Sequence, residues 1–393
     1  MSKNDELEKK QQFKCHICGN TDPRSIGIIK GRPYCRKCIS FRGEEVKKDD
    51  SYPVKAPIFI DYELSEDQKR LSKEILKNYK EGRNTLVHAV CGSGKTEIVL
   101  EVIKYAIRCG EKVGFAIPRR DVVIELCERF KNIFKENNVF SVYGGHTEIL
   151  KGDLVVLTSH QLYRYDNYFD LLIMDEIDAF PFKGSEVLEA FFNRAVKGNY
   201  VLMSATPSKQ VLNKFTTENN RMVELFSRFH HYPLPVPKVI IHKEFLLFVL
   251  LIENLTRFIK EKKPTMVFTP TIEKCEETYK YLSIFCKGGD YVHSQRKDRS
   301  KTIDKFRNGR SKYIVTTAVL ERGVTVKNVQ VIIYNANHAV YDRHALIQIS
   351  GRVGRKKDAP TGEVLYLATG INEEIKSSIS EIKRANENLQ NLL

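Results

Sequence analysis

The chain has 393 residues, too many for one core of ordinary size, so we expect two or three domains. Hydrophobic residues make up 42% of it and charged residues 29%, as is typical of a soluble globular protein. The longest apolar run, Phe245 to Ile252, is too short to cross a membrane, and the polar segment Met1 to Lys10 lacks the apolar centre of a secretory signal. We therefore expect no transmembrane helix and a cytoplasmic location.

The formal net charge of +15 favours a polyanionic partner, because Lys and Arg side chains that bind phosphates release condensed counterions. Nucleic acid is the leading candidate. A basic chain that is merely kept soluble by its charge explains the composition equally well. Only the distribution of charge along the chain can separate the two interpretations.

Two C-x2-C pairs, separated by sixteen residues, lie near the N-terminus. This spacing is typical of a zinc site in which each pair brackets a tight turn and directs two thiolates at one ion. Residues 25–34 between the pairs are predicted to form a β-hairpin with its turn at 30–32, as in a zinc ribbon. The metal would take the place of the hydrophobic core that so short a segment lacks. The predicted zinc ligands are Cys15, Cys18, Cys35 and Cys38.

Basic and aromatic side chains are interleaved around these cysteines. Such a surface is suited to binding phosphates and stacking on bases. A ribbon that only packs against the neighbouring part of the chain explains the same residues equally well, so both interpretations stay open.

A glycine-rich turn that ends in Lys-Thr follows the apolar stretch 85–88. Gly92 and Gly94 have no Cβ to block the approach of a phosphate to the backbone N–H groups, Lys95 neutralises phosphate charge, and Thr96 can bind Mg²⁺. The pattern departs from the usual phosphate-binding loop in having Ala in place of the first Gly. The residues expected to bind nucleotide here are Ala89, Val90, Cys91, Gly92, Ser93, Gly94, Lys95 and Thr96.

Apolar strands alternate with helices along the rest of the chain, which predicts two mostly parallel α/β sheets. Helical spacing covers 64–79, 98–106 and 245–259, and strand-like runs cover 85–90, 112–117, 153–158, 171–174, 200–203, 265–269, 312–316 and 329–334. Three alternating prolines in 230–238 favour a stiff linker. We predict a zinc module at 1–55, a nucleotide-binding lobe at 56–232, a linker at 233–238, a second α/β lobe at 239–372 and a C-terminal helix at 373–393.

Asp175 and Glu176 directly follow a run of four apolar residues. Hydrolysis of a nucleoside triphosphate requires Mg²⁺ and a group that orients the attacking water, and both are usually supplied at the end of a buried strand. We therefore expect Asp175 to bind Mg²⁺ and Glu176 to polarise the water. Arg352 and Arg355, three positions apart, are suited to bidentate contacts with a γ-phosphate as arginine fingers.

In this order the motifs resemble those of the superfamily 2 helicases and translocases. Residues 89–96 resemble motif I, 175–178 motif II, 204–206 motif III and 348–355 motif VI. The resemblance implies two RecA-like lobes and a nucleic-acid-dependent ATPase. Further residues that it implies are Gln68, Gly323 and Gln348 for nucleotide, Ser204 and Thr206 for coupling, and Pro118, Arg119, Arg120, Thr158, Ser159, His160, Thr269, Thr316 and Thr317 for nucleic acid.

The cysteines before the motor and the extended motif II, residues 175–181, resemble the ComFA family of late competence ATPases. PriA-type helicases differ, because their cysteines lie between motor motifs. The resemblance implies ATP, Mg²⁺ and Zn²⁺ as cofactors and single-stranded DNA as substrate, with duplex DNA as a further ligand. It also implies a membrane DNA channel and ComFC as partners and a place at the inner face of the cell membrane. Association into a homo-oligomer stays open.

Two other functions stay open. One is a duplex-unwinding helicase of DNA repair or replication restart, which would use the same motor motifs. The other is a zinc-dependent nucleic-acid-binding adaptor whose NTP site acts as a switch, which the paired arginines disfavour.

Overall fold

The computed structural model divides into two compact units. One contains residues 1–88 and 95–224, and the other contains residues 89–94 and 225–393. The structure describes residues 9–41, 43–47, 52–90, 92–216, 219–226, 228, 232–318 and 326–390. Two residues of the predicted nucleotide site, Cys91 and Gly323, lie outside these ranges. Within the described part of the chain, no helix is both long and apolar enough to cross a membrane.

The cysteine-rich segment forms the expected hairpin. Strand β1 (Ile26–Ile29) pairs antiparallel with β2 (Arg32–Cys35), after a short 3-10 helix η1 (Pro23–Ser25). The turn is one residue shorter than predicted, because Arg32 already pairs with Ile29. Lys30 and Gly31 carry the turn with φ of 49° and 76°, the two positive values that a two-residue hairpin turn requires.

The first unit contains a seven-stranded sheet in the order β5-β6-β4-β7-β8-β3-β9. Its strands are β3 (Asn84–Ala89), β4 (Val113–Ile117), β5 (Val139–Val142), β6 (Leu154–Thr158), β7 (Phe169–Asp175), β8 (Val196–Ser204) and β9 (Asn220–Leu225). From β5 to β3 every neighbouring pair is parallel. The sequence pattern did not predict β5 and β9. Both are edge strands whose half-exposed residues interrupt the apolar run.

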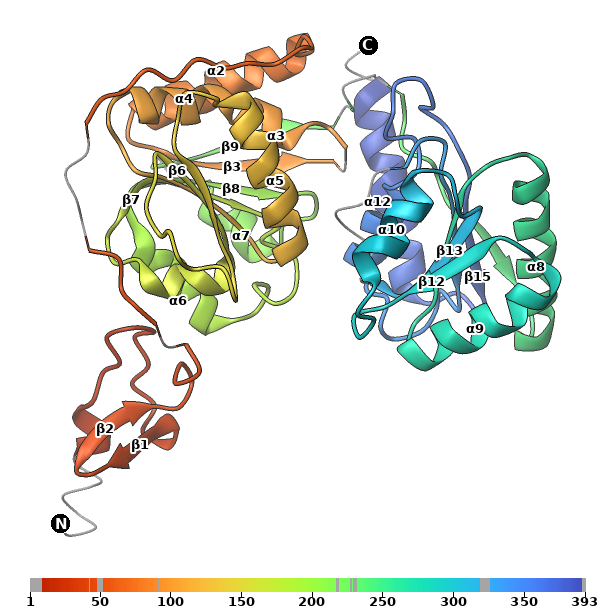
Figure 1. Ribbon diagram of the computed structural model, residues 1–393, viewed down its shortest axis with the longest axis horizontal. Coiled ribbons are helices and arrows are strands. Elements are labelled where there is room, and N and C mark those ends of the chain that lie inside the picture. Colours follow the sequence, from red (N-terminus) through yellow and green to blue (C-terminus); the bar gives the residue numbers. More distant parts are fainter. Residues whose placement is uncertain are drawn as a thin grey trace. The chain divides into compact units, whose positions relative to one another are not determined.

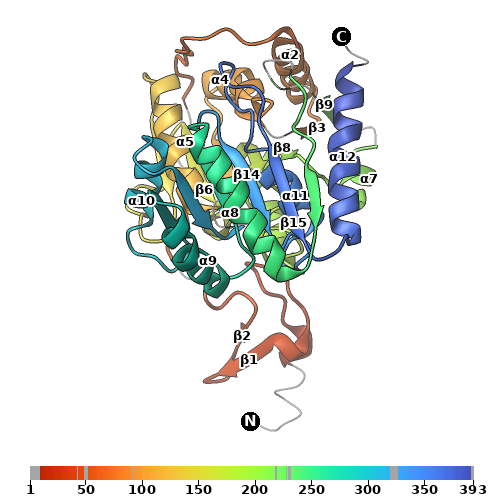
Figure 2. The ribbon, with the colours of Figure 1, turned by 90° about the vertical axis from the view of Figure 1, so that its right-hand side faces the viewer.

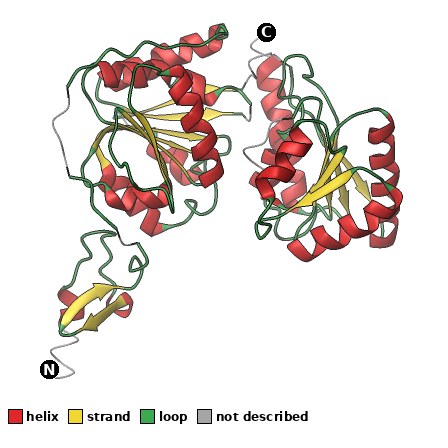
Figure 3. Ribbon diagram, viewed as in Figure 1, coloured by secondary structure: helices red, strands yellow, loops and turns green. Residues whose placement is uncertain are grey.

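Helices cover this sheet, as Figure 3 shows in red around the yellow strands. They are α2 (Glu66–Lys80), α3 (Lys95–Ile98), α4 (Leu100–Arg108), α5 (Arg120–Ile133), α6 (Glu186–Ala195), α7 (Lys209–Lys214) and the 3-10 helix η2 (Ser159–Arg164). The single helix predicted after the glycine-rich turn is two helices, α3 and α4, with Val99 between them. Aromatic and aliphatic side chains of α6 and η2 pack in one core with β7.

The second unit contains a six-stranded parallel sheet in the order β10-β15-β14-β11-β13-β12. Its strands are β10 (Lys238–Ile241), β11 (Thr265–Phe268), β12 (Gly289–Val292), β13 (Tyr313–Thr316), β14 (Gln330–Tyr334) and β15 (Val364–Ala368). The three predicted strands are confirmed. The sequence pattern missed β10 and β12, which are edge strands, and also the internal, fully buried β15.

Helices lie on both faces of the second sheet (Figure 1). They are α8 (Glu244–Lys260), α9 (Ile272–Phe285), α10 (Arg299–Arg307), α11 (Arg343–Ser350) and α12 (Glu373–Gln390). Helices α8 and α9 share one apolar core with the sheet, whereas α10, α11 and α12 share another. Figure 2 faces α8, which packs over β14 and β15. Two parallel sheets, each covered by helices, confirm the predicted pair of RecA-like lobes.

Candidate functional site

Three neighbouring parallel strands of the first sheet end at one edge and carry predicted site residues. Strand β7 ends at Asp175, β8 ends at Ser204, and β3 ends at Ala89, where the glycine-rich turn begins. His88 lies opposite Ser204, and Asp175 lies opposite Met203. The carboxyl edge of a parallel sheet is where α/β proteins bind ligands. The sheet therefore brings the loops of motifs I, II and III together.

Lys95 and Asp175 form an ion pair at this edge. The Nζ of Lys95 lies 3.8 Å from Oδ1 of Asp175, and the side chains are 15% and 17% exposed. The same Oδ1 accepts a hydrogen bond of 2.8 Å from the backbone N–H of Glu176, whose φ is 60°. A left-handed backbone is costly for a residue with a Cβ, and such residues cluster at functional sites. The turn directs two consecutive carboxylates out of one strand end.

The donor set fits a hydrated Mg²⁺. Asp175 offers carboxylate oxygens at the end of β7, and Thr96, the residue after Lys95, offers a hydroxyl. Mg²⁺ prefers one or two such oxygen ligands and completes its shell with water and substrate phosphates.

The glycine-rich turn depends on two left-handed residues, because Gly92 and Gly94 have φ of 81° and 83°. A Cβ added at Gly92 would meet its nearest atoms, on Arg228 and Arg355, at 3.6 and 3.7 Å, which is ordinary contact. Backbone conformation, and not lack of space, is therefore what favours glycine there. Ser93 is fully buried, and Val90 N donates to Leu225 O at 3.0 Å.

Asp178 joins motif II to motif III, a role that the sequence motifs alone did not assign to it. Its two carboxylate oxygens accept hydrogen bonds from Ser204 Oγ at 2.9 Å and from Thr206 Oγ1 at 2.8 Å. All three side chains are buried. Charge-assisted hydrogen bonds in a buried setting are strong, so a shift of either motif is transmitted to the other. A coupling role for Ser204 and Thr206 stays a prediction.

Gln68 has a visible role at a helix start. Its backbone N–H donates to Ser65 Oγ, and its Oε1 accepts from Ser65 N at 3.0 Å, which forms a capping box for α2. The side chain is buried, and α2 packs against α3, the helix that begins with Lys95. Contact between Gln68 and an adenine stays a prediction.

In the second unit, the turn after α11 carries both predicted arginine fingers. Arg352 is 1% exposed, and Arg355 Nε donates to Gly351 O at 3.0 Å. Gln348 lies on α11 and is buried. The turn includes Gly354 with φ of 71°, where a Cβ would come within 2.3 Å of Pro360 O. The backbone there is closely packed, which holds both arginines in defined places.

A third arginine holds this turn and carried no sequence signal. Arg228 is 1% exposed, and its Nη1 donates to Val353 O at 2.7 Å and to Gly354 O at 2.8 Å. Its Nη2 donates to Gly351 O at 3.2 Å. A lone arginine more than 120 residues away in sequence belongs to no local motif. Three hydrogen bonds from one buried guanidinium make Arg228 a structural support of the turn.

The four predicted zinc ligands converge. Their sulfur atoms all lie within 4.8 Å of one another, and the cysteines are buried. Cys15 Sγ lies 3.4 Å from Cys38 Sγ, and Cys18 Sγ lies 3.6 Å from Cys35 Sγ. Tetrahedral zinc with bonds of about 2.3 Å requires sulfur separations of about 3.8 Å, so the cluster fits the ion. Burial raises the pKa of the Cys18 thiol to about 11, and a bound cation would offset that cost.

Two groups of predicted nucleic-acid contacts in the first unit are brought together. Pro118, Arg119 and Arg120 follow β4, and Thr158 ends the adjacent β6, with Ile117 opposite Thr158. The guanidinium of Arg120 lies 4.8 Å from the centre of the Tyr143 ring. Ser159 and His160 begin η2, and the ring of His160 stacks on Phe41. These contacts place the residues at one sheet edge, and DNA binding by them stays a prediction.

The corresponding residues of the second unit also meet. Thr269 donates to the carbonyl oxygen of Thr316 from its backbone N at 2.8 Å and from its hydroxyl at 3.1 Å. The hydroxyl of Thr316 donates to Thr317 O at 3.2 Å. Thr269 and Thr316 are fully buried, so in this structure their hydroxyls serve the chain itself. Thr317 is half-buried.

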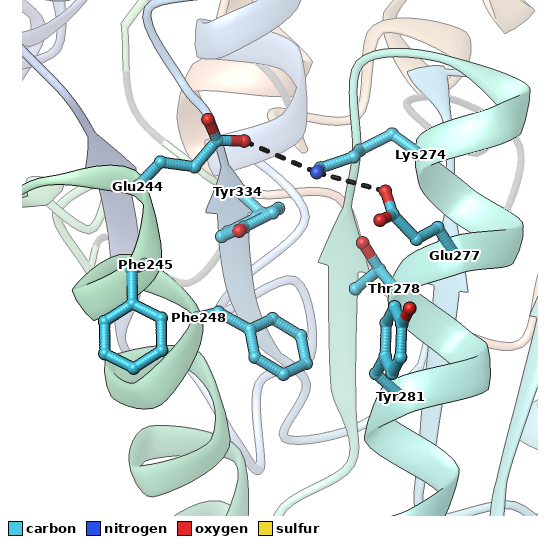
Figure 4. A pocket seen from close by; sticks show the side chains of 8 residues that line it. All are labelled: Glu244, Phe245, Phe248, Lys274, Glu277, Thr278, Tyr281 and Tyr334. Carbon is cyan, nitrogen blue, oxygen red and sulfur yellow. Dashed lines mark ion pairs between the residues drawn. The ribbon is translucent and has the colours of Figure 1, made fainter.

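A groove of about 290 Å³ lies between α8 and α9 of the second unit (Figure 4). Phe245 and Tyr281 line it with apolar surface. At its polar end Lys274 lies 3.4 Å from Glu244 and 3.1 Å from Glu277, which joins the two helices. None of the predicted site residues lines this groove.

Two protein families match the chain. Residues 61–209 match the res subunit of type III restriction enzymes, and residues 248–357 match the helicase conserved C-terminal domain. The competence protein ComFA of Bacillus subtilis is 32% identical over 96% of this chain and 86% of its own length. ComFA of Streptococcus pneumoniae is also 32% identical, over 97% of this chain and 92% of its own length.

A solved structure shares the fold. Dbp5 of S. cerevisiae, bound to RNA and ADP BeF3, superposes with a TM-score of 0.61 at 18% identity. The match covers 82% of this chain and 92% of Dbp5. At this identity the likeness concerns the arrangement of helices and strands alone.

We expect the purified protein to carry one zinc ion per chain, because four converging thiolates complete a tetrahedral shell. The substitution Cys38→Ser should remove most of the zinc that elemental analysis measures. Cys109→Ser is the matched control, since this cysteine is exposed and lies outside the cluster. Wild-type protein without zinc would contradict the assignment.

The variant Arg228→Met should destabilise the second unit by about 3 kcal/mol, because it removes three charge-assisted hydrogen bonds to backbone carbonyls of the turn. Chemical denaturation monitored by circular dichroism would measure the change. Arg384→Met, an exposed arginine on α12, is the control and should change stability by less than about 0.5 kcal/mol. Equal effects of the two substitutions would refute the role of Arg228.

Proposed function

Because the chain belongs to the ComFA family of competence proteins within helicase superfamily 2, we propose that it moves single-stranded DNA during uptake in natural transformation. The chain is an ATP-dependent nucleic-acid helicase or ATPase, as its two helicase regions and its relatives establish. The part that we propose is that cycles of ATP hydrolysis drive the movement of one DNA strand.

The grouping of motifs I, II and III at one sheet edge carries the proposal. The Nζ of Lys95 lies 3.8 Å from Oδ1 of Asp175. Asp178 follows Asp175 by three residues, and its carboxylate accepts hydrogen bonds from the hydroxyls of Ser204 and Thr206. A nucleotide-dependent shift of the Asp175 carboxylate would thus pull on β8 through Asp178. A motor needs such a connection between its ATP site and its DNA contacts.

Each residue of the site has a role in the proposed reaction. The loop of residues 89–94, through the glycine backbone at 92 and 94, and the Lys95 ammonium bind the phosphates of ATP. Thr96 and Asp175 hold Mg²⁺, which supplies positive charge to the phosphoryl group when it is bound. Glu176 orients the attacking water, and the guanidinium groups at 352 and 355 stabilise charge on the γ-phosphoryl oxygens.

Two groups of residues are proposed to hold the DNA strand. They are the carboxyl-edge residues of the first unit (Pro118, Arg119, Arg120, Thr158, Ser159, His160) and those of the second (Thr269, Thr316, Thr317). Their positions at the carboxyl edges of the two sheets support this proposal. Zn²⁺ would hold the cysteine module together. We propose that the chain divides by function into the predicted segments 1–55, 56–232, 233–238, 239–372 and 373–393.

The family suggests the setting of this activity. We propose that the protein works in the cytoplasm, at the inner face of the membrane, beside a DNA channel and a ComFC-type partner. Relatives named ComFA are competence proteins, and this is the support for that setting.

The proposal predicts ATP hydrolysis that single-stranded DNA stimulates by about tenfold or more. Phosphate release from the full-length protein, with and without a single-stranded oligonucleotide, measures this effect. No stimulation by DNA would reject the motor and favour the adaptor with an NTP switch. A strand-displacement assay then distinguishes a translocase from a duplex-unwinding helicase, because only the helicase releases the annealed strand.

Two substitutions test the assigned roles. Lys95→Ala should abolish both ATP binding and turnover, whereas Glu176→Gln should lower kcat by at least about 10²-fold and still bind ATP, since only the water-orienting carboxylate is lost. Fluorescent-nucleotide binding and steady-state kinetics separate the two outcomes. Glu111→Gln, a carboxylate away from the sheet edge that bonds to Tyr79, is the matched control and should keep its turnover.

A further inference from the structure

A short segment leads from the fourth zinc-ligand cysteine onto the helicase fold of the first unit. We call this segment, Phe41 together with residues 43–46, the strap. It begins three residues after Cys38, and Phe41 N donates to Cys38 O at 3.0 Å. The position of the Phe41 ring is thus tied directly to the cysteine cluster.

The Phe41 ring packs among three aromatic rings of the helicase fold. Its centre lies 5.9 Å from that of His160 with the ring planes 20° apart, which is a stacked pair. Phe191 on α6 meets it edge-on at 5.0 Å, and Tyr163 lies at 6.0 Å. Aromatic pairs at these distances are stabilising beyond their buried area. Burial also lowers the pKa of His160, which favours the neutral form of its ring.

The backbone of the strap pairs with the other end of η2. Arg164, the last residue of η2, is buried and its Nη1 donates to Glu44 O at 3.0 Å. Its carbonyl accepts from Val46 N at 2.8 Å, and its Nε donates to Gln161 Oε1 at 2.7 Å. The strap therefore holds η2 at both ends, through His160 and through Arg164.

The strap is closely packed at Gly43. A Cβ added at Gly43 would lie 2.4 Å from Nη1 of Arg164 and 2.5 Å from Oη of Tyr163. Arg194 on α6 fixes the same region, because it donates to Tyr163 O at 2.7 Å and to Glu45 Oε1 at 2.9 Å.

Helix η2 needs this support. It is a 3-10 helix of six residues, longer than the three or four that such helices usually sustain, because their hydrogen-bond geometry is poor. Ser159 and His160, which are proposed to contact DNA, are its first two residues. An unsupported η2 would have to become ordered when DNA binds, and that cost would weaken binding.

We propose that Phe41 is a positioning residue for nucleic-acid binding, which holds η2 in the arrangement that receives the DNA strand. This inference rests on the proposed function, since it requires residues 158–160 to contact DNA. The strap then makes DNA binding depend on the cysteine module, while Asp175 of the ATP site is held at the end of β7 by the sheet.

The test compares Phe41→Ala and Phe41→Leu with the control Phe245→Ala, which truncates a phenylalanine that is 79% exposed in the second unit. The affinity for a fluorescent single-stranded oligonucleotide, the basal ATPase, the DNA-stimulated ATPase and the zinc content are measured on full-length proteins. Both Phe41 variants should raise the Kd for DNA about tenfold and lose most of the stimulation. Their basal ATPase should stay within about twofold of the wild type. The variant Phe41→Tyr, which keeps an aromatic ring, should bind DNA as the wild type does.

The outcomes separate the inference from the proposed function. If DNA does not stimulate the wild type, the proposed function fails first. If the wild type responds and both Phe41 variants respond equally well, the positioning role is wrong. Phe41→Leu keeps apolar volume against Phe191 and decides the matter should Phe41→Ala fold poorly. Loss of basal activity together with DNA stimulation in Phe41→Leu would also overturn the inference, because it indicates a general structural role.

Discussion

The parallel pairing of β7, β8 and β3 is the constraint on which the candidate ATP site depends. Each of these strands is hydrogen-bonded to its neighbours, so the height at which it ends is fixed by register. That register alone places Asp175, Ser204 and the start of the glycine-rich turn at one edge. Shifting β8 by one residue would turn Ser204 to the opposite face and break its bond to Asp178. The chemistry of the site therefore depends on backbone pairing more than on any single side chain.

Much of this framework could be predicted from sequence, because buried parallel strands appear as uninterrupted apolar runs. The runs predicted at 153–158, 171–174 and 200–203 correspond to strands β6, β7 and β8, and the polar residues that follow the last two runs mark a sheet edge. The strands that escaped prediction are mostly short edge strands with half-buried positions, such as β5 and β12. The fully buried β15 was missed even though its apolar run is clear.

The site residues also divide into those that a local sequence pattern identifies and those that it does not. Lys95, Asp175 and the four cysteines belong to local patterns whose spacing has a chemical meaning, so the sequence alone could single them out. Arg228 and Phe41 act through partners more than 100 residues away, Gly351 and His160 among them, and no local pattern records such contacts. A buried arginine that serves backbone carbonyls looks in the sequence like any surface arginine. Only the folded structure shows which backbone carbonyls Arg228 binds.

The turn after α11 has an electrostatic consequence. The turn carries Arg352 and Arg355 and is bound by the guanidinium of Arg228, and both Arg228 and Arg352 are almost fully buried. Positive charges in a region of low dielectric create a local potential that attracts anions. A polyphosphate that binds near this turn only in the folded protein would stabilise the fold. Ligand affinity and the stability of the second unit are then thermodynamically linked.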